Sequence, residues 1–169
     1  MHIPLEVIEL SKLYNKKEAV KNISFKINKN EIIGILGPNG CGKTTTIGMI
    51  LGLLKPSKGK VLINGFEIES KRVDLLNNLN FISPYIELPK KLTVKENLEV
   101  YGRLYDVKNL SSKIEYLADK LRLNEIIYKI TGELSSGQKN RVSLAKSIIN
   151  DPTVLLLDEP TASLDPETG

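Results

Sequence analysis

The sequence predicts an α/β fold in which a core with a parallel sheet is joined by a flanking antiparallel β subdomain and a helical insert. Two apolar runs predict the parallel sheet: "EIIGIL" at 31–36 is rich in Ile and Leu, and "TVLLLDEP" at 153–160 is continuous and closed by proline. Such runs are typical of strands covered on both faces. From about 93 to 130 the apolar period becomes that of a helix, which predicts the insert.

The antiparallel subdomain is predicted from two segments with alternating apolar and polar residues. These are "PLEVIELSKLY" at 4–14 and "VKNISFKIN" at 20–28, a pattern typical of half-exposed strands. The stretch "GKVLINGFEI" at 59–68 predicts a hairpin that turns at Asn64-Gly65. Together they indicate a small β-rich layer beside the core.

Four helices are expected. The first, "KTTTIGMILGLL" at 43–54, follows the first apolar strand and is stopped by the "KPSKG" stretch. The other three are identified by their apolar faces. The second helix has Val94, Leu98, Tyr101 and Tyr105 on one face, and the third has Ile114, Leu117 and Leu121, behind possible caps at Ser111 and Ser112. The fourth has Val142, Ala145, Ile148 and Ile149 on one face. We expect one domain over 1–169, with a core of 1–83 and 150–169 and a helical insert at about 84–149.

Composition excludes several classes of protein. With 41% hydrophobic and 26% charged residues, the chain is neither disordered nor collagen-like. The longest apolar run, "IGMILGLL" at 47–54, is far shorter than the roughly 20 residues of a membrane span. No secretory leader is recognised, and the single cysteine excludes an internal disulfide. The net charge of +4 comes without a dense basic block or an aromatic ladder, so no nucleic-acid partner is expected.

The stretch "GPNGCGKT", Gly37 to Thr44, fits the phosphate-binding pattern GxxxxGK[ST] and lies between a predicted strand and a predicted helix. Glycines let backbone N–H groups turn toward a β-phosphate, the helix N-terminus adds its positive end, and Lys43 reaches the β and γ oxygens. Thr44 would place its hydroxyl on Mg²⁺. The alternative is a glycine-rich turn that binds nothing. The candidate phosphate-binding residues are Gly37, Pro38, Asn39, Gly40, Cys41, Gly42, Lys43, Thr44 and Thr45.

Cys41 is interpreted as a tolerated small residue of this loop rather than a nucleophile, because no histidine near it in sequence could activate its thiol. At the other end of the chain, "VLLLDE" places two carboxylates after an apolar strand. Asp158 could hold the Mg²⁺ shell, and Glu159 could orient or deprotonate an attacking water. The alternative is a charged strand terminus with no catalytic part.

With the phosphate loop, "LSSGQ" at 134–138 and "LLLDEP" at 155–160 in this order, the chain resembles the ATP-binding cassette (ABC) ATPase family over essentially all 169 residues. The resemblance implies a P-loop NTPase core and the cofactors ATP and Mg²⁺, with Lys43 and Glu159 as catalytic residues. "TASLDPETG" matches the family's D-loop and implies that Asp165 is near the nucleotide, while Tyr14 matches the aromatic residue that stacks on adenine. Packing within the β subdomain is the alternative for Tyr14.

The family pairs two nucleotide-binding domains head to tail, with each ATP between the P-loop of one and the signature motif of the other. Carried onto "LSSGQ", this implies that Ser135, Gly137 and Gln138 belong to the nucleotide site, with Ser135 and Gly137 facing a γ-phosphate at a helix N-terminus. It also implies transmembrane permease subunits as partners, a cytoplasmic location at the inner face of the cell membrane, and ATP hydrolysis that powers transport. "LTVKENLEVYGRLYDV" at 92–107 is similar to the exporter branch.

Two departures from the family are visible. Pro84 stands where the family's Q-loop has a glutamine, and proline has neither a side-chain amide nor a backbone N–H. Glu87 is a hypothetical substitute. The family's switch histidine is also missing, because His2 is the only histidine. We therefore expect a piece of a longer ATPase domain that binds nucleotide weakly and hydrolyses it slowly.

Two other functions stay open at this point. One is a non-transport ABC ATPase with a role in translation or regulation, although no long coiled coil separates the motifs. The other is a nucleotide-binding switch that no longer hydrolyses ATP, which the missing glutamine favours. A GTPase fits less well, because no base-reading NKxD motif follows the phosphate motifs.

Overall fold

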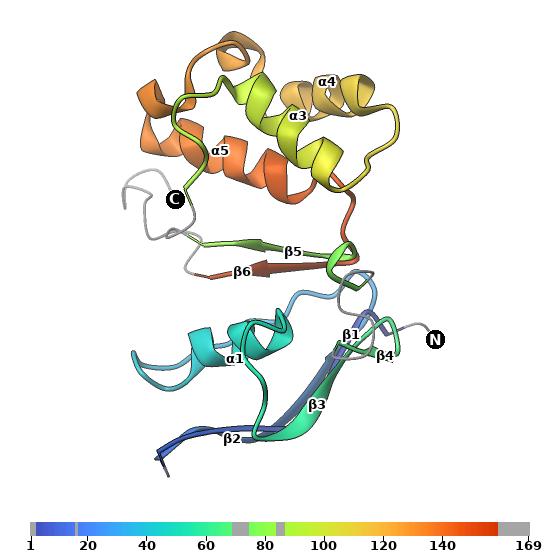
Figure 1. Cartoon of the computed structure of the whole chain (residues 1–169), viewed down its shortest axis with the longest axis vertical. Helices are drawn as coiled ribbons and strands as arrows, with labels where there is room; N and C mark the ends of the chain where they lie inside the picture. Colours follow the sequence, from blue (N-terminus) through green and yellow to red (C-terminus); the bar gives the residue numbers. More distant parts are fainter. Residues whose placement is uncertain (1–2, 16, 69–74, 84–86, 159–169) are drawn as a thin grey trace. The chain divides into compact units, whose positions relative to one another are not determined.

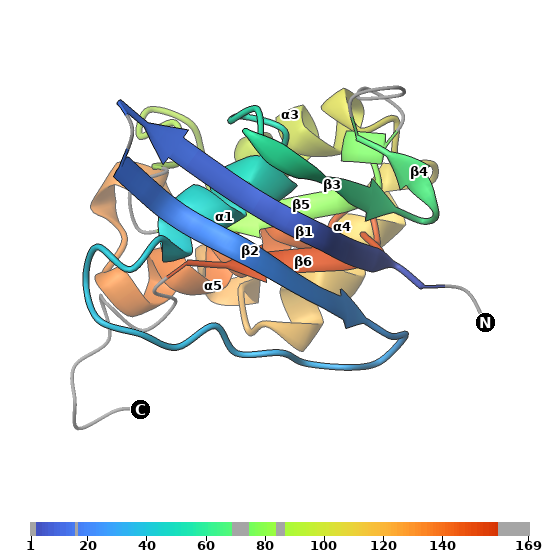
Figure 2. The same ribbon diagram turned by 90° about the horizontal axis from the view of Figure 1, so that it is seen from below.

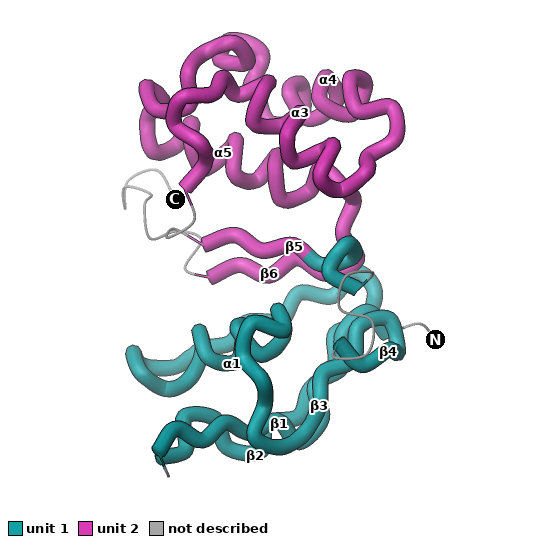
Figure 3. Tube along the Cα trace, viewed as in Figure 1, with its two compact units in different colours: residues 1–79 teal, residues 80–169 magenta. Residues whose placement is uncertain are grey.

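The computed structural model of the chain describes residues 3–15, 17–68, 75–83 and 87–158. It has two compact units, Met1–Leu79 and Asn80–Gly169, which Figure 3 draws in different colours. Each unit has a sheet and buried apolar residues of its own. Within the described ranges, no helix has the length and apolar character that a bilayer span requires. The division predicted from the sequence, a core of 1–83 and 150–169 with an insert at 84–149, stays a prediction.

The first unit is built on a four-stranded antiparallel sheet in the order β2-β1-β3-β4 (Figure 2). Leu5 in the central strand lies opposite Ile27 on one side and Ile63 on the other, and its side chain is fully buried. This confirms the antiparallel subdomain predicted from alternation. Its strands are β1 (Leu5–Tyr14), β2 (Lys17–Ile27), β3 (Lys58–Ile63) and β4 (Phe66–Glu67).

The predicted hairpin turn is confirmed. Asn64 and Gly65 join β3 to β4 with φ angles of 53° and 83°, both in the left-handed region. Two consecutive positive φ angles define the tight turn whose twist matches that of paired strands, and Asn-Gly is the sequence that adopts it most readily. The local sequence alone therefore determines this corner of the sheet.

Helix α1 (Lys43–Ile50) follows the glycine-rich loop, as predicted, but it ends four residues earlier than expected. Gly52 adopts a positive φ of 64°, and the N–H groups of Leu53 and Leu54 both donate to the carbonyl of Gly48. This arrangement closes the helix before the apolar run is finished. The buried residues of α1 are Thr46, Ile47, Gly48, Met49 and Ile50.

The predicted buried strand at 31–36 is wrong for this structure. The segment has no regular secondary structure, and the side chains of Ile32 and Leu36 are 98% and 94% exposed. Four strands of the first unit pair with each other, and this segment is not among them. An apolar run becomes a strand only where neighbouring strands accept its backbone hydrogen bonds, and that pairing is not a local property of the sequence.

A two-stranded sheet, which lies in the second unit except for Leu79, consists of β5 (Leu79–Ile82) and β6 (Val154–Leu157), and these run side by side in the same direction (Figure 1). The N–H of Asp158 continues the pairing by donating to the carbonyl of Ile82 at 2.9 Å. The predicted strand at "TVLLLDEP" is confirmed as β6, whereas β5 was missed. The expectation that both faces of β6 are covered is wrong here, because Leu157 is 47% exposed.

The helices of the second unit, α3 (Val94–Leu104), α4 (Leu110–Lys120) and α5 (Ser136–Ser147), enclose one apolar core. The turns η1 (Asn124–Ile126) and η2 (Thr131–Glu133) connect α4 to α5. All three predicted apolar faces pack as expected. The buried members are Leu88, Val94, Leu98, Ile114, Leu117, Ala118, Leu123, Ile126, Leu134, Val142, Ala145 and Ile149, with Tyr101, Tyr105, Leu121 and Ile148 packed against them.

The caps predicted at Ser111 and Ser112 are wrong. Helix α4 begins at Leu110, and its N-cap is Asn109 in a left-handed conformation. The physical reason is the close approach of two helices: Leu110 lies so near Gly102 of α3 that a methyl group on Gly102 would overlap it. Because Leu110 packs against Gly102, α4 begins at Leu110, one residue before Ser111.

Candidate nucleotide-binding site

The phosphate-loop candidates lie on the segment that leads into α1. Gly42 is the N-cap of α1 and adopts a φ of 99°, and a side chain there would overlap the carbonyl oxygen of Ala19 on β2. Gly40 has a φ of 82°. These are backbone conformations that residues with a side chain rarely adopt. The glycines thus let the chain turn sharply into α1, and the first N–H groups of this helix, as at any helix start, have no partners within it.

The ammonium of Lys43 lies over this loop. Its Nζ donates to the carbonyl oxygens of Gly37 at 2.7 Å and Pro38 at 3.0 Å, and it is 4.0 Å from Sγ of Cys41. The next residue, Thr44, is exposed, and the first turn of α1 contains no acidic residue. A positive helix end, an ammonium and an exposed hydroxyl are a donor set that suits a phosphate group with its metal ion. The loop itself therefore fits the predicted ligand.

Tyr14 ends β1 with its side chain 45% exposed. The ammonium of Lys12 lies 5.1 Å from the centre of its ring. The packing alternative would predict a buried ring, so exposure is compatible with stacking on a base. The adenine contact stays a prediction.

Asp158 follows β6 and is only 6% exposed, as expected for a residue at the end of an apolar strand. A buried carboxylate is costly unless it finds a cation or hydrogen-bond donors, which is consistent with a metal role. Among the described residues, no group of three or more His, Cys, Asp or Glu could form a protein-only metal site. Glu159, Asp165 and Pro84 lie outside the described residues.

The signature stretch begins α5. Ser135 is its N-cap, and the hydroxyl of Ser135 accepts a hydrogen bond from the N–H of Gln138, while Oε1 of Gln138 accepts one from the N–H of Ser135. This capping box was not predicted from the sequence, although its S-x-x-Q pattern could have revealed it. Ser135 is exposed, and the space around Gly137 is open. A hydroxyl that accepts a hydrogen bond can still donate its own proton to an anion.

Glu87, the proposed substitute for the missing glutamine, forms an ion pair with Lys90 at 2.8 Å. That hydrogen-bonded ammonium lowers the pKa of the Glu87 carboxyl, and the charge of Lys139 in the first turn of α5 contributes in the same direction. Glu87 is thus ionised near neutral pH and is held by a lysine on its own segment. A metal role for it stays a hypothesis.

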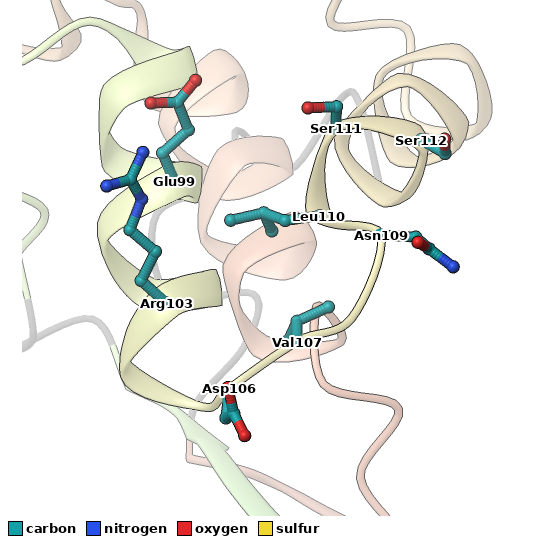
Figure 4. A pocket seen from close by; sticks show the side chains of 8 residues that line it. All are labelled: Glu99, Arg103, Asp106, Val107, Asn109, Leu110, Ser111 and Ser112. Atoms are coloured by element: carbon teal, nitrogen blue, oxygen red, sulfur yellow. The ribbon is translucent and has the colours of Figure 1, made fainter.

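A hollow of about 630 Å³ lies in the second unit, between α3 and the turn that precedes α4 (Figure 4). Val107 and Leu110 contribute its apolar part, while Glu99, Arg103 and Asp106 contribute charges. Two carboxylates against one guanidinium make a poor site for a nucleotide phosphate. This hollow is therefore not a candidate binding site for the predicted nucleotide.

A family model described as "ABC transporter" matches residues 20–162. The chain belongs to the ABC transporter family. It is 39% identical to Nod factor export ATP-binding protein I of Rhizobium johnstonii over 167 residues. This alignment covers 97% of this chain and 53% of that protein. It is 35% identical to ABC transporter ATP-binding protein NatA of Bacillus subtilis, over 88% of this chain and 61% of that protein.

Solved structures agree with this membership. An ATP-binding subunit of an ABC transporter superposes with a TM-score of 0.87 at 27% identity, covering 96% of this chain and 68% of that one. The cbiO1 subunit of Clostridium perfringens, part of the ABC transporter complex cbiONQ, superposes with a TM-score of 0.85 at 31% identity, covering 99% and 69%. The chain carries the nucleotide-binding domain of this family, and it spans about half the length of the curated relatives it matches.

Proposed function

We propose that this domain binds and hydrolyses ATP to power export across a membrane. The observation that carries the proposal is the glycine-rich loop that ends at α1, where the left-handed conformation at position 42 requires a glycine and Lys43 extends over the loop. Membership of the ABC transporter family and the export role printed for the Rhizobium relative support it.

In the proposed reaction, the loop N–H groups and Lys43 bind the β- and γ-phosphates and balance their negative charge. Thr44 and Asp158 offer a hydroxyl and a carboxylate, the oxygen ligands that Mg²⁺ prefers, and the ion would neutralise charge on the phosphate oxygens. Glu159 orients a water for attack on the γ-phosphorus and accepts its proton. Tyr14 stacks on the adenine ring, and Asp165 lies near the nucleotide.

The second half of the site comes from another copy of the domain. Ser135 and Gly137 at the start of α5 face the γ-phosphate that the partner's P-loop holds, in a head-to-tail dimer. The exposure of Ser135 and the absence of acidic residues from the first turn of α5 support this role. Transmembrane permease subunits are the proposed partners, with the domain on the cytosolic face of the cell membrane.

Phosphate release by the full-length protein tests the proposal. Lys43→Met should lower the hydrolysis rate by at least about 100-fold, because one charge that stabilises the transition state is lost. Lys108→Met is the matched control, since Lys108 is an exposed lysine of the second unit and should leave the rate unchanged. Equal rates for the two variants would refute hydrolysis at this loop.

A domain that only binds nucleotide is the second candidate, and Pro84 at the position of the family's glutamine favours it. Comparison of the full-length protein with its Glu159→Gln variant separates the two functions. Equal, near-zero phosphate release with intact ATP binding would support the binding-only function, whereas loss of a measurable rate in Glu159→Gln supports hydrolysis.

A further inference from the structure

Two segments that are far apart in the sequence are joined in the second unit. The pre-helix segment, residues 87–93, leads into α3, and the pre-signature segment, residues 127–133, leads to the signature motif. Thr93 and Ile130 form an antiparallel bridge. On either side of it, the N–H of Val94 donates to the carbonyl of Lys129 at 3.0 Å, and the N–H of Thr131 donates to the carbonyl of Leu92 at 2.9 Å.

The buried side chain of Asn97 forms hydrogen bonds with both of these segments. Asn97 lies on α3 and is fully buried. The two hydrogens of its amide nitrogen are shared among Oγ1 of Thr131 at 2.8 Å and the carbonyl oxygens of Thr93 at 3.0 Å and Pro89 at 3.2 Å. The hydroxyl of Thr131 in turn donates to the carbonyl of Leu92 at 2.8 Å. One amide therefore links both segments.

The oxygen of the same side-chain amide lacks a hydrogen-bond donor among the described residues. Oδ1 of Asn97 is buried and has no hydrogen-bond partner among the residues that the structure describes. A buried acceptor without a partner destabilises the fold, and a leucine at this position of α3 would avoid that cost. The placement of an asparagine is therefore explained by what its nitrogen holds, rather than by packing of the core.

A further hydrogen bond joins the pre-helix segment to η2, just before α5. Gly132 donates its N–H to the carbonyl of Lys90 at 3.0 Å, and a side chain on Gly132 would approach that oxygen to 2.9 Å. Glu87 of the same segment feels the charge of Lys139 in the first turn of α5. The hydrogen bond from Gly132 therefore adds a second link between the pre-helix segment and the residues that lead into α5.

We infer that Asn97 and Thr131 are positioning residues that tie Ser135 to the pre-helix segment, so that a displacement of this segment moves the signature serine. Thr131 precedes Ser135 by four residues, and Leu134 between them is anchored in the core. The inference rests on the proposed function, in which Ser135 contacts the ATP of the partner domain. It adds two residues that touch neither the nucleotide nor the metal ion.

The test compares Thr131→Val, which removes the hydroxyl, with Thr131→Ser, which keeps it, in the full-length protein. In the Glu159→Gln background, ATP-dependent dimerisation should be about tenfold weaker for Thr131→Val, because the variant loses both hydrogen bonds of the Thr131 hydroxyl. Thr131→Ser should restore it. ATP affinity of the monomer should stay within about twofold, because the P-loop lies in the other unit. If Thr131→Val does not fold, Thr131→Ala serves in its place.

Amide hydrogen exchange gives a readout that needs no nucleotide. The N–H of Gln138 donates to Oγ of Ser135, so its exchange should be faster in Thr131→Val and unchanged in Thr131→Ser. Equal exchange in the two variants would overturn the inference even in an active ATPase. If wild-type protein shows no ATP-dependent dimer while Gln138 still responds to Thr131→Val, the proposed function fails and the positioning role stands.

Discussion

Gly42 and Ala19 are so close that no side chain fits between them: a methyl group built on Gly42 would overlap the carbonyl oxygen of Ala19. Gly42 also adopts a φ of 99° as the N-cap of α1. The residue that starts α1 is thus fixed by a strand of the antiparallel sheet. Loop geometry and the packing of β2 therefore depend on each other.

Gly42→Ala should consequently lower both stability and nucleotide affinity. We expect a loss of about 2–4 kcal/mol in the free energy of unfolding, because the new methyl group meets a backbone oxygen and the φ angle is strained. Gly65→Ala is the control, with a φ of 83° but open space around it. It should cost about 1 kcal/mol and leave ATP binding intact. Urea denaturation and titration with a fluorescent ATP analogue measure both quantities; equal effects of the two variants would contradict the packing argument.

Ser135→Arg should leave ATP binding by the monomer nearly unchanged and abolish ATP-dependent dimerisation. The long cationic side chain would fill the open face of the signature motif, where Ser135 is exposed. Loss of the cap adds a stability cost of about 1 kcal/mol. Ser135→Thr keeps the capping oxygen, and Ser112→Arg places the same charge on an exposed serine of α4. Gel filtration with Mg-ATP distinguishes the outcomes, and loss of monomer binding would mean that the motif acts within one chain.

The capping box of α3 should make stability depend on pH in acid. The N–H and hydroxyl of Thr93 donate to Glu96, and these hydrogen bonds lower the pKa of its carboxyl. A carboxyl with a lowered folded-state pKa contributes stability above its unfolded pKa, near 4.5, and loses it as pH falls through the folded value. The difference in unfolding free energy between wild type and Glu96→Gln should therefore narrow below about pH 4.5. A difference that is constant with pH would exclude this contribution.

Lys146 should be a site where removal of a charge stabilises the protein. Burial lowers the pKa of its ammonium, which lies 4.5 Å from the centre of the Tyr101 ring. The charged form is therefore disfavoured in the folded state, and wild-type stability should rise as pH increases through this lowered pKa toward the unfolded value near 10.5.

Lys146→Met should accordingly be more stable than wild type at neutral pH, with the gain shrinking at alkaline pH. Thermal unfolding of Lys146→Met and of the exposed-site control Lys108→Met, followed between about pH 7 and pH 10, checks this. A loss of stability at neutral pH would show that the contact with the Tyr101 ring outweighs the cost of burial.

Features encoded within a few residues were predictable from the sequence. The Asn64-Gly65 turn, the helix after the glycine-rich loop and the apolar face that contains Val94 and Leu98 depend on local conformation or on period, and the structure has all of them. The exposed segment with Ile32 was not predictable in this way, because pairing of a strand depends on residues elsewhere in the chain.

The same limit applied to the candidate site. The glycines and Lys43 follow from one contiguous motif. Asn97 gave no signal, because in a helical pattern it looks like one polar residue among others and its partner Thr131 lies 34 positions later. The cap at Asn109 was missed since the contact between Leu110 and Gly102, rather than serine chemistry, fixes the start of α4.

The capping box of α5 also contains a side chain that can serve as a natural NMR probe. Gln138 is the only glutamine of these 169 residues, and its side chain is hydrogen-bonded to the N–H of Ser135. Isotope labelling of glutamine alone in this chain would give a single pair of side-chain amide resonances. Those two signals report on one helix end, so they would test the proposed contact between Ser135 and a phosphate without any mutation.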